Sequence, residues 1–263
     1  MSDVAKVNFT DYPASVTRAL DLIGAPARLA DARFIILKPN LVNGAAPPVT
    51  TPAGLTAAVI DYCRKHTRGE IAIGEGCGSG KTKDTFETNG YANLARRHKL
   101  RLIDFNEVEA VKLSRPDALV WKELYLPKIV LDAFLISLPV LKDHSFTQTT
   151  IAMKNLIGLV PATYYSGSWN KSKMHTPSTH RSVVDVCLYK RPDLCVVDAT
   201  TALTGMHLSG TPKKLDLILA SFDPVAVDAV GSRLLGHDPR KIEYLTLADG
   251  WLGNLAGIRE LVS

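Results

Sequence analysis

Short apolar runs that alternate with helix-like segments constrain the fold of this chain more than any other feature. The runs RFIIL at 33–37, EIAI at 70–73 and LRLIDF at 100–105 have the length and composition of buried strands. Helices are predicted between them at 51–66 and 85–98, and the first has a proline near its start, as helix N-termini favour. This β-α-β-α-β order predicts a parallel sheet with helices on its faces.

The second half of the chain continues the alternation after a less regular middle, where two strands of a hairpin or meander are predicted at 111–126. Further strands are predicted at 133–138, 194–198 and 215–221. We therefore predict one three-layer α/β domain over residues 1–263, with a largely parallel central sheet and helices on both faces. A division into two lobes would fall near residue 115, but no change in composition marks a boundary there.

Charge and composition narrow the class of partner. Hydrophobic residues make up 46% of the chain and charged residues 22%, which is typical of globular proteins and excludes disorder or a coiled coil throughout. Lys and Arg number 31 against 26 Asp and Glu, which gives a net charge of +5. This mild excess suits a small anionic metabolite as well as it suits nucleic acid. Because no dense basic run is present, we expect no nucleic-acid partner.

The cysteines and the N-terminal residues indicate the compartment. None of the four cysteines forms a CxxC pair, so free thiols in a cytoplasmic protein are expected: Cys63, Cys77, Cys187 and Cys195. The first residues lack the basic and apolar regions of a signal peptide. The longest apolar runs are too short to span a bilayer, so we expect no membrane partner.

A glycine-rich segment, GEGCGSGKT at 74–82, follows a predicted strand and precedes a predicted helix. Backbone N–H groups in that setting can hold an anion, which makes Gly76 and Gly78 candidate binding residues. The spacing does not match the P-loop GxxxxGK[ST], since Gly76 and Gly80 enclose only three residues. A mobile loop is the alternative. Glu75 lies at the carboxyl end of the strand, where open α/β sheets place their ligands.

Polar residues also follow the first strand, as Lys38-Pro39-Asn40. Lys38 and Asn40 are expected to share one side of the extended chain, because alternate residues of a strand do so. An amine and an amide there could bind a carboxylate or a phosphate. The alternative is a solvated strand end.

A stronger candidate is the run PVLKDH at 139–144, followed by a helix predicted at 147–159 that contains Lys154 and Asn155. Lys142 and His144 alternate, and lysines near a histidine lower its pKa and favour a neutral imidazole that can act as a base. We expect His144 to be the general acid/base, with Glu75 or Asp198 as its orienting group or as a second base. Lysines 38, 142 and 154 would hold an anion. A purely structural histidine is the alternative.

The polar segment 161–179 is long for a loop within one domain, and loops of that length are often lids. It brings His175 close in sequence to His180, with Asp185 one helical turn further on. Histidine and carboxylate together suit nickel, iron or zinc, although the HExxH pattern is absent. Contact with substrate and a plain exposed loop are the alternatives for these two histidines.

Several short motifs occur in a fixed order: KPNLV, GEG, PVLKDH, MKNLIG, HRSVVD, VVDA and DPVAVDAVGSRLLG. From about Phe34 to Gly253 they resemble domain-of-unknown-function family 362. The resemblance implies a cytoplasmic α/β protein, and many relatives are joined to ferredoxin-like iron–sulfur segments. This chain lacks clustered cysteines, so no iron–sulfur cluster is expected. The motif positions that the resemblance implies are Lys38, Asn40, Glu75, Lys142, His144, Lys154, Asn155, His180, Asp198 and Asp228.

Three hypotheses about function follow. The first is an enzyme that acts on a small anionic metabolite by Lys/His acid/base chemistry. The second is a metal- or cofactor-dependent redox protein that receives electrons from a separate ferredoxin-like partner. The third is a non-catalytic module that binds an anionic ligand. The first is favoured because histidines add little to simple anion binding.

Overall fold

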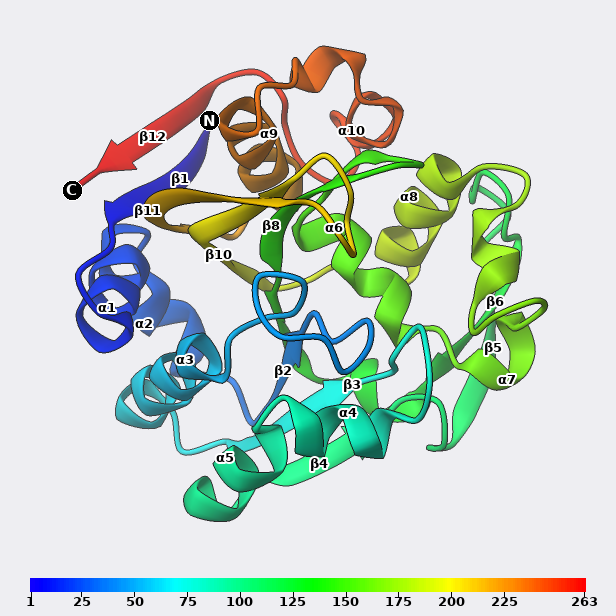
Figure 1. The fold of residues 1–263 in the computed structure, drawn as a ribbon, viewed down its shortest axis with the longest axis horizontal. Coiled ribbons are helices and arrows are strands. Elements are labelled where there is room, and N and C mark those ends of the chain that lie inside the picture. Colours follow the sequence, from blue (N-terminus) through cyan, green and yellow to red (C-terminus); the bar gives the residue numbers. More distant parts are fainter.

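A ten-stranded sheet runs through the molecule in the computed structural model, which describes residues 1–263 (Figure 1). Its strands are β1 (Ser2–Asn8), β2 (Phe34–Pro39), β3 (Glu70–Glu75), β4 (Arg101–Asp104), β7 (Phe134–Leu138), β8 (Val140–His144), β9 (Gln148–Thr150), β10 (Leu194–Thr204), β11 (Thr211–Ser221) and β12 (Ile258–Val262). The order along the sheet is β12-β1-β11-β10-β7-β2-β3-β4, and β8 with β9 branches from β10. A separate hairpin joins β5 (Ala110–Ser114) to β6 (Glu123–Pro127).

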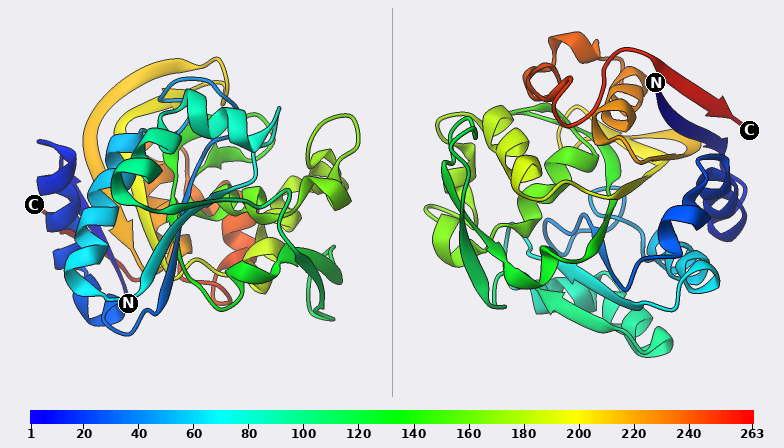
Figure 2. Two further views of the ribbon diagram at one scale, coloured as in Figure 1. Left: turned by 90° about the horizontal axis from the view of Figure 1, so that it is seen from below. Right: turned by 180° about the vertical axis from the view of Figure 1, so that it is seen from behind.

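Most neighbouring strands are parallel, as predicted. Strands β4, β3, β2, β7 and β10 form one continuous parallel block. Strand β11 runs antiparallel to both of its neighbours, β10 and β1. The final strand β12 lies parallel to β1, so the first and last strands of the chain lie side by side (Figures 1 and 2).

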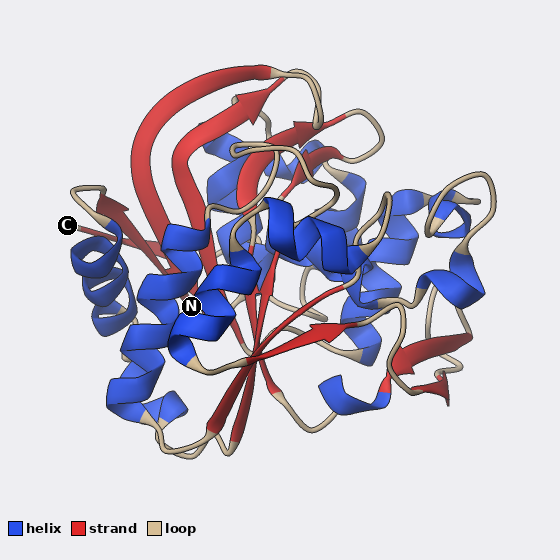
Figure 3. Ribbon diagram, turned by 60° about the horizontal axis from the view of Figure 1, so that its bottom comes forward, coloured by secondary structure: helices blue, strands red, loops and turns tan.

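Helices cover both faces of this sheet (Figure 3). They are α1 (Tyr12–Leu22), α2 (Ala25–Leu29), α3 (Ala53–His66), α4 (Thr82–Thr88), α5 (Tyr91–His98), α6 (Ala152–Asn155), α7 (Ala162–Tyr165), α8 (Thr179–Tyr189), α9 (Pro224–Leu234) and α10 (Glu243–Ala248). Short 3₁₀ turns lie at Lys128–Val130, Leu156–Leu159, Ser172–His175 and Pro239–Lys241.

The apolar runs of the sequence are continuous because their strands are buried on both faces. In β2, Ile35 and Leu37 join a core of 28 buried residues that also includes side chains of α1 and α3. Ile36 points the other way and joins a second core of 27 residues that includes side chains of α8 and α10. The predicted three-layer α/β architecture is therefore confirmed.

Two local expectations differ from the structure. The segment 147–159, predicted as one helix, is divided between β9, α6 and a 3₁₀ turn. Strands β10 and β11 extend well beyond the predicted ranges and form a long curved ribbon, yellow in Figure 2, whose turn lies at 205–210. Sequence patterns missed this ribbon because its outer half carries polar residues, such as Lys213 and Lys214, that are solvent-exposed rather than buried.

The four cysteines are buried and unpaired, as expected. No helix combines the length and the apolar composition that crossing a membrane requires.

Candidate functional site

A cavity of about 400 Å³ opens at the carboxyl ends of β2 and β3. Strand β8, helix α6, the segment 161–179 and the β10–β11 turn complete its walls. Loops at this edge of a parallel sheet bring groups from several strands together, which is why α/β proteins place ligands there. The charged residues of the lining are four lysines and one carboxylate: Lys38, Lys142, Lys154, Lys171 and Glu75.

Lys38 and Glu75 form a buried ion pair that joins the ends of β2 and β3. Lys38 Nζ lies 2.9 and 3.0 Å from the two carboxylate oxygens, and it also donates to Asn155 Oδ1 and a backbone carbonyl. Glu75 accepts further hydrogen bonds from the N–H groups of Leu41 and Gly76. Burial lowers the pKa of Lys38, and the Glu75 charge opposes that shift. The pair therefore holds the two strand ends together and keeps neither charge free for a ligand.

The side-chain amide of Asn155 is also fully hydrogen-bonded within the protein. Its Nδ2 donates to the Lys38 carbonyl and to Ser137 Oγ, and its Oδ1 accepts from both Lys38 Nζ and Asn40 Nδ2. Asn40, in contrast, keeps a buried Oδ1 without a partner, and Thr150 keeps a buried hydroxyl without one. Both residues line the cavity, so they are polar groups that a ligand can satisfy.

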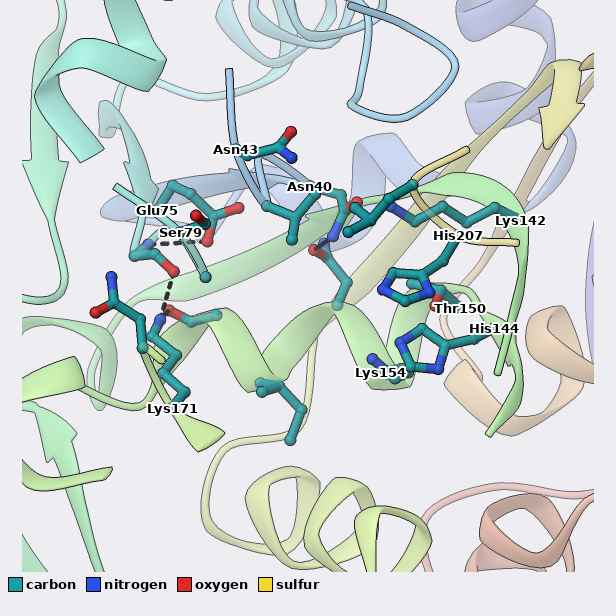
Figure 4. A pocket seen from close by; sticks show the side chains of 18 of the residues that line it. Asn40, Asn43, Glu75, Ser79, Lys142, His144, Thr150, Lys154, Lys171 and His207 are labelled. Atoms are coloured by element: carbon teal, nitrogen blue, oxygen red, sulfur yellow. Dashed lines mark hydrogen bonds between the residues drawn. The ribbon is translucent and has the colours of Figure 1, made fainter. Parts of the chain in front are cut away.

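Lys142 and Lys154 carry the amines of the cavity that make the fewest hydrogen bonds within the chain. Lys142 Nζ donates only to the carbonyl of Val49, at 2.7 Å, and the Lys154 amine makes no hydrogen bond within the chain. Burial, with the nearby Lys154 charge, lowers the pKa of Lys142 to about 7. Burial also lowers the pKa of Lys154 to about 8. Figure 4 shows these two lysines at one end of the cavity, opposite the end that holds Glu75 and Lys171.

His144 is held in one tautomer by its own turn. Its Nδ1 accepts a hydrogen bond from the backbone N–H of Phe146 at 3.0 Å. The neutral ring therefore carries its proton on Nε2. Burial lowers the pKa of His144 well below its usual value, and the Lys154 charge acts in the same direction. The predicted neutral imidazole fits this environment, but it offers the cavity an N–H donor rather than the lone pair of a general base.

The glycine-rich segment does not form the anion cradle that its sequence suggested. The N–H groups of residues 76–79 all have acceptors inside the chain, on Glu75, Thr82 and Val42. Gly76 is needed for another reason, since a Cβ there would lie 2.7 Å from the carbonyl oxygen of Gly158. This tight contact brings the end of β3 close to the 3₁₀ turn Leu156–Leu159 that follows α6, within the cavity lining.

Lys171 attaches the segment 161–179 to the point where Gly76 and Gly158 meet. Its buried Nζ donates to the carbonyls of Gly76 and Gly158, and its backbone has a φ of 63°, in the left-handed region. Burial lowers the pKa of Lys171 to about 7. The segment predicted as a lid therefore forms one wall of the cavity, with the buried Lys171 side chain as its attachment there.

The family model described as Domain of unknown function (DUF362) matches residues 35–233. This chain belongs to the DUF362 family. One curated relative is the thylakoid-associated protein sll1697 of Synechocystis sp. (strain ATCC 27184 / PCC 6803 / Kazusa), which is 29% identical over 215 residues. The match covers 79% of this chain and 64% of that relative, so the chain spans less than two thirds of the relative's length.

The region matched by the DUF362 model contains every residue that lines the cavity. Seven of the ten motif positions implied by the family resemblance line it: Lys38, Asn40, Glu75, Lys142, His144, Lys154 and Asn155. Gly76, Gly78 and His175, which were predicted as site residues on other grounds, line it as well. The structure therefore brings most of the predicted residues together.

Three other motif positions have structural roles. Asp198 accepts from Tyr12 and Thr200 and does not line the cavity, so its predicted role beside His144 is wrong. Asp228 accepts from two backbone N–H groups at the start of α6, and burial raises its pKa to about 7. His180 Nδ1 accepts from the backbone N–H of Tyr244, which fixes α8 against α10.

The predicted metal ligands are not arranged as a metal site. His175 lines the cavity and bonds Thr179, whereas His180 lies outside it. The structure contains no group of three or more His, Cys, Asp or Glu side chains placed to hold a metal ion.

Among the titratable residues of the lining, sequence reasoning missed two, Lys171 and His207. His207 lies at the turn of the β10–β11 ribbon and stacks on His144, with ring centroids 4.0 Å apart. Asp143 holds that turn in place by accepting from the Gly205 N–H, and it also bonds His237. The glycines at 205 and 210 are a hairpin signal that could have indicated the turn.

Proposed function

We propose that this DUF362 chain binds a small anionic metabolite in the cavity and acts on it as an enzyme through lysine and histidine chemistry. The observation that carries the proposal is Lys154, a buried residue that lines the cavity and whose amine has no hydrogen-bond partner in the chain. An ammonium group that is largely surrounded by protein and has no counter-charge is unfavourable, and an anionic ligand would supply the missing partner. Lys142, with one partner, would bind the same group.

The division of chemical roles follows from the protonation of each group. Because its pKa is about 7, Lys142 is present in two forms near neutral pH. The ammonium form helps Lys154 to bind the acidic group, and in the chains where Lys154 holds that group alone, the neutral amine of Lys142 can act as a general base. His144, with its proton on Nε2, would donate a hydrogen bond to an oxygen on which negative charge develops. Lys154 would hold the acidic group of the substrate. Histidine thus takes the role of a donor, and lysine takes the role of the base.

Titration calorimetry with sulfate tests the binding step. Lys154→Met is expected to weaken sulfate binding about tenfold or more, since a charge-assisted hydrogen bond is lost. Lys65→Met removes the same charge from an exposed position at the end of α3 and is expected to change nothing. Equal sulfate affinity in wild type and Lys154→Met would refute the proposal.

Proton exchange tests the catalytic step. A panel of carboxylate-bearing metabolites is incubated in D₂O with the wild type and with Lys142→Met, and deuterium incorporation is followed by NMR. We expect exchange with at least one metabolite, and its loss in the variant. Binding without any exchange would instead favour the non-catalytic module.

The redox alternative, with a metal and a ferredoxin-like electron donor, stays a prediction. His144, His175 and His207 line one cavity, but two lysines in the same lining would repel a cation. Elemental analysis of protein purified without air tests it, and about one nickel, iron or zinc per chain would favour it over acid/base chemistry.

A further inference from the structure

Five aromatic rings form a continuous wall along the cavity. In the order in which neighbouring rings contact one another they are Trp169, His175, Phe146, His144 and His207, and all five line the cavity. Successive ring centroids lie 6.1, 5.3, 5.7 and 4.0 Å apart, which is the range of favourable aromatic contact. We refer to these five residues as the aromatic wall.

The aromatic wall carries no charge at neutral pH. Burial, with the Lys154 charge, lowers the pKa of His175 and of His207 to about 4, and it lowers the pKa of His144 further. The three imidazoles are therefore neutral planar rings whose faces are available for stacking. Charge in this part of the cavity belongs to Lys142 and Lys154, which lie beside His144 and His207 in Figure 4.

The outer rings of the wall are unusually exposed for their type. Phe146 is 55% exposed and Trp169 is 51% exposed, although both line the cavity. Apolar surface at the mouth of a cavity is a common feature of ligand sites. An inorganic anion would reach the lysines and leave these rings in water, whereas a flat organic ligand would cover them.

We propose that the ligand is a planar aromatic acid. Its carboxylate or phosphate binds Lys142 and Lys154, and its ring stacks along the aromatic wall towards Phe146 and Trp169. The inference rests on the proposed function, because it assumes that the two lysines bind an anion, and it adds the chemical class of the remainder of the ligand. A volume of about 400 Å³ accommodates an acidic group together with a ring system.

Titration calorimetry with three phosphates tests the inference: inorganic phosphate, phenyl phosphate and cyclohexyl phosphate. The two esters have the same charge and similar size, and only the first has a flat π face. Phenyl phosphate is expected to bind about five- to tenfold more tightly than cyclohexyl phosphate, as aromatic pairing allows. Equal affinity of the two esters would overturn the inference.

Leucine variants locate the effect on the wall. Phe146→Leu and Trp169→Leu keep an apolar side chain but remove the ring, so each is expected to weaken phenyl phosphate several-fold and to leave inorganic phosphate unchanged. Trp251→Leu removes an exposed tryptophan that does not line the cavity, and it is the matched control. If Phe146→Leu weakens phenyl phosphate and cyclohexyl phosphate by the same factor, the ring of Phe146 contacts the ligand through its bulk and does not stack on it.

The outcomes also separate this inference from the proposed function. If no phosphate binds, and Lys154→Met behaves as the wild type does, the proposed function itself fails. If all three phosphates bind with equal affinity, anion binding stands and only the aromatic class of ligand is wrong.

Discussion

At the scale of single residues, the lysines of the cavity differ because their partners differ. Lys38 makes four hydrogen bonds, two of them to Glu75, whereas Lys154 makes none. The same residue type therefore serves as a fixed structural cation in one place and as an available amine in another. The tautomer of His144 is likewise set by one partner, the backbone N–H that donates to its Nδ1.

Sulfate affinity is expected to fall as pH rises from 6 to 9. Sulfate keeps its charge over this range, so the protein alone titrates. Lys142 and Lys154 have pKa values of about 7 and about 8, and they hold an anion only when protonated. Affinity is therefore greatest below pH 7 and declines by up to about tenfold per pH unit per lysine above these values. Calorimetry at four pH values measures the slope.

Lys154→Met provides the control for that slope, because it removes one of the two titrating amines. Only Lys142 titrates in this variant, so sulfate affinity is expected to fall less steeply with pH than in the wild type. The difference is expected to be clearest above pH 8, where Lys154 loses its proton in the wild type. An affinity that rises with pH would contradict the assignment of either lysine as the anion-binding group.

Glu75→Gln is expected to destabilise the fold by about 3 to 5 kcal/mol. The amide leaves the Lys38 ammonium buried without a counter-charge, and its NH₂ group must face a backbone N–H that Glu75 now accepts. Urea unfolding measures the loss. Glu70→Gln, which removes an exposed partner of Arg101, is the matched control and is expected to cost no more than about 1 kcal/mol.

At the scale of elements, the shortest helices are held in place by contacts from other elements. Helix α6 has only four residues and is too short to be stable alone. Asp228, from α9, accepts the first two N–H groups of α6, and the packing of Gly158 against Glu75 holds its far side. The position of Lys154 therefore depends on α9 and β3 rather than on its own helix.

Lys171→Met is expected to loosen the segment 166–175. The variant leaves the carbonyls of Gly76 and Gly158 without their donor, so the segment keeps only an exposed hydrogen bond from Asn170 to Gly80 at this place. Amide hydrogen exchange followed by mass spectrometry should show protection in 166–175 falling about tenfold or more, with β1 and β11 unchanged.

Lys173→Met is the control for this variant, since Lys173 belongs to the same segment but is exposed. Unchanged exchange in Lys171→Met would mean that aromatic packing, such as the stacked pair Tyr125 and Tyr164, is enough to hold the segment.

At the scale of the whole molecule, one sheet separates two large cores of similar size. Both cores take side chains from the same strands, with alternate residues of β2 contributing to each. The cavity lies where β2 and β3 end, so both cores help to position it. Each core combines residues from before and after 115, such as Ile35 with Ile136 in the first and Ile36 with Leu135 in the second.

Urea unfolding is therefore expected to be a single transition. All three tryptophans, Trp121, Trp169 and Trp251, lie after residue 115, so their fluorescence reports only on the second part of the chain. Far-UV circular dichroism reports on the whole chain. Coincident curves would support one domain, and a fluorescence midpoint displaced from the circular dichroism midpoint would indicate two lobes.

Much of the site was predictable because its residues follow strand ends. Lys38, Glu75 and Lys142 were identified from alternation and from their place after or within apolar runs, and the structure puts all three in one lining. Asp198 was identified by the same reasoning, and it lies elsewhere. A strand end predicts the edge of the sheet but not the direction of the side chain.

The sequence by itself determined the α/β architecture, since a strand buried on both faces needs a continuous apolar run and a helix needs its own periodicity. Only the tertiary structure decided which polar groups are free. Whether Lys154 is paired, which nitrogen of His144 carries the proton, and that His207 reaches His144 all depend on contacts between segments far apart in the chain. Local patterns carry no information about such contacts, because hydrogen bonding and burial are set by neighbours in space.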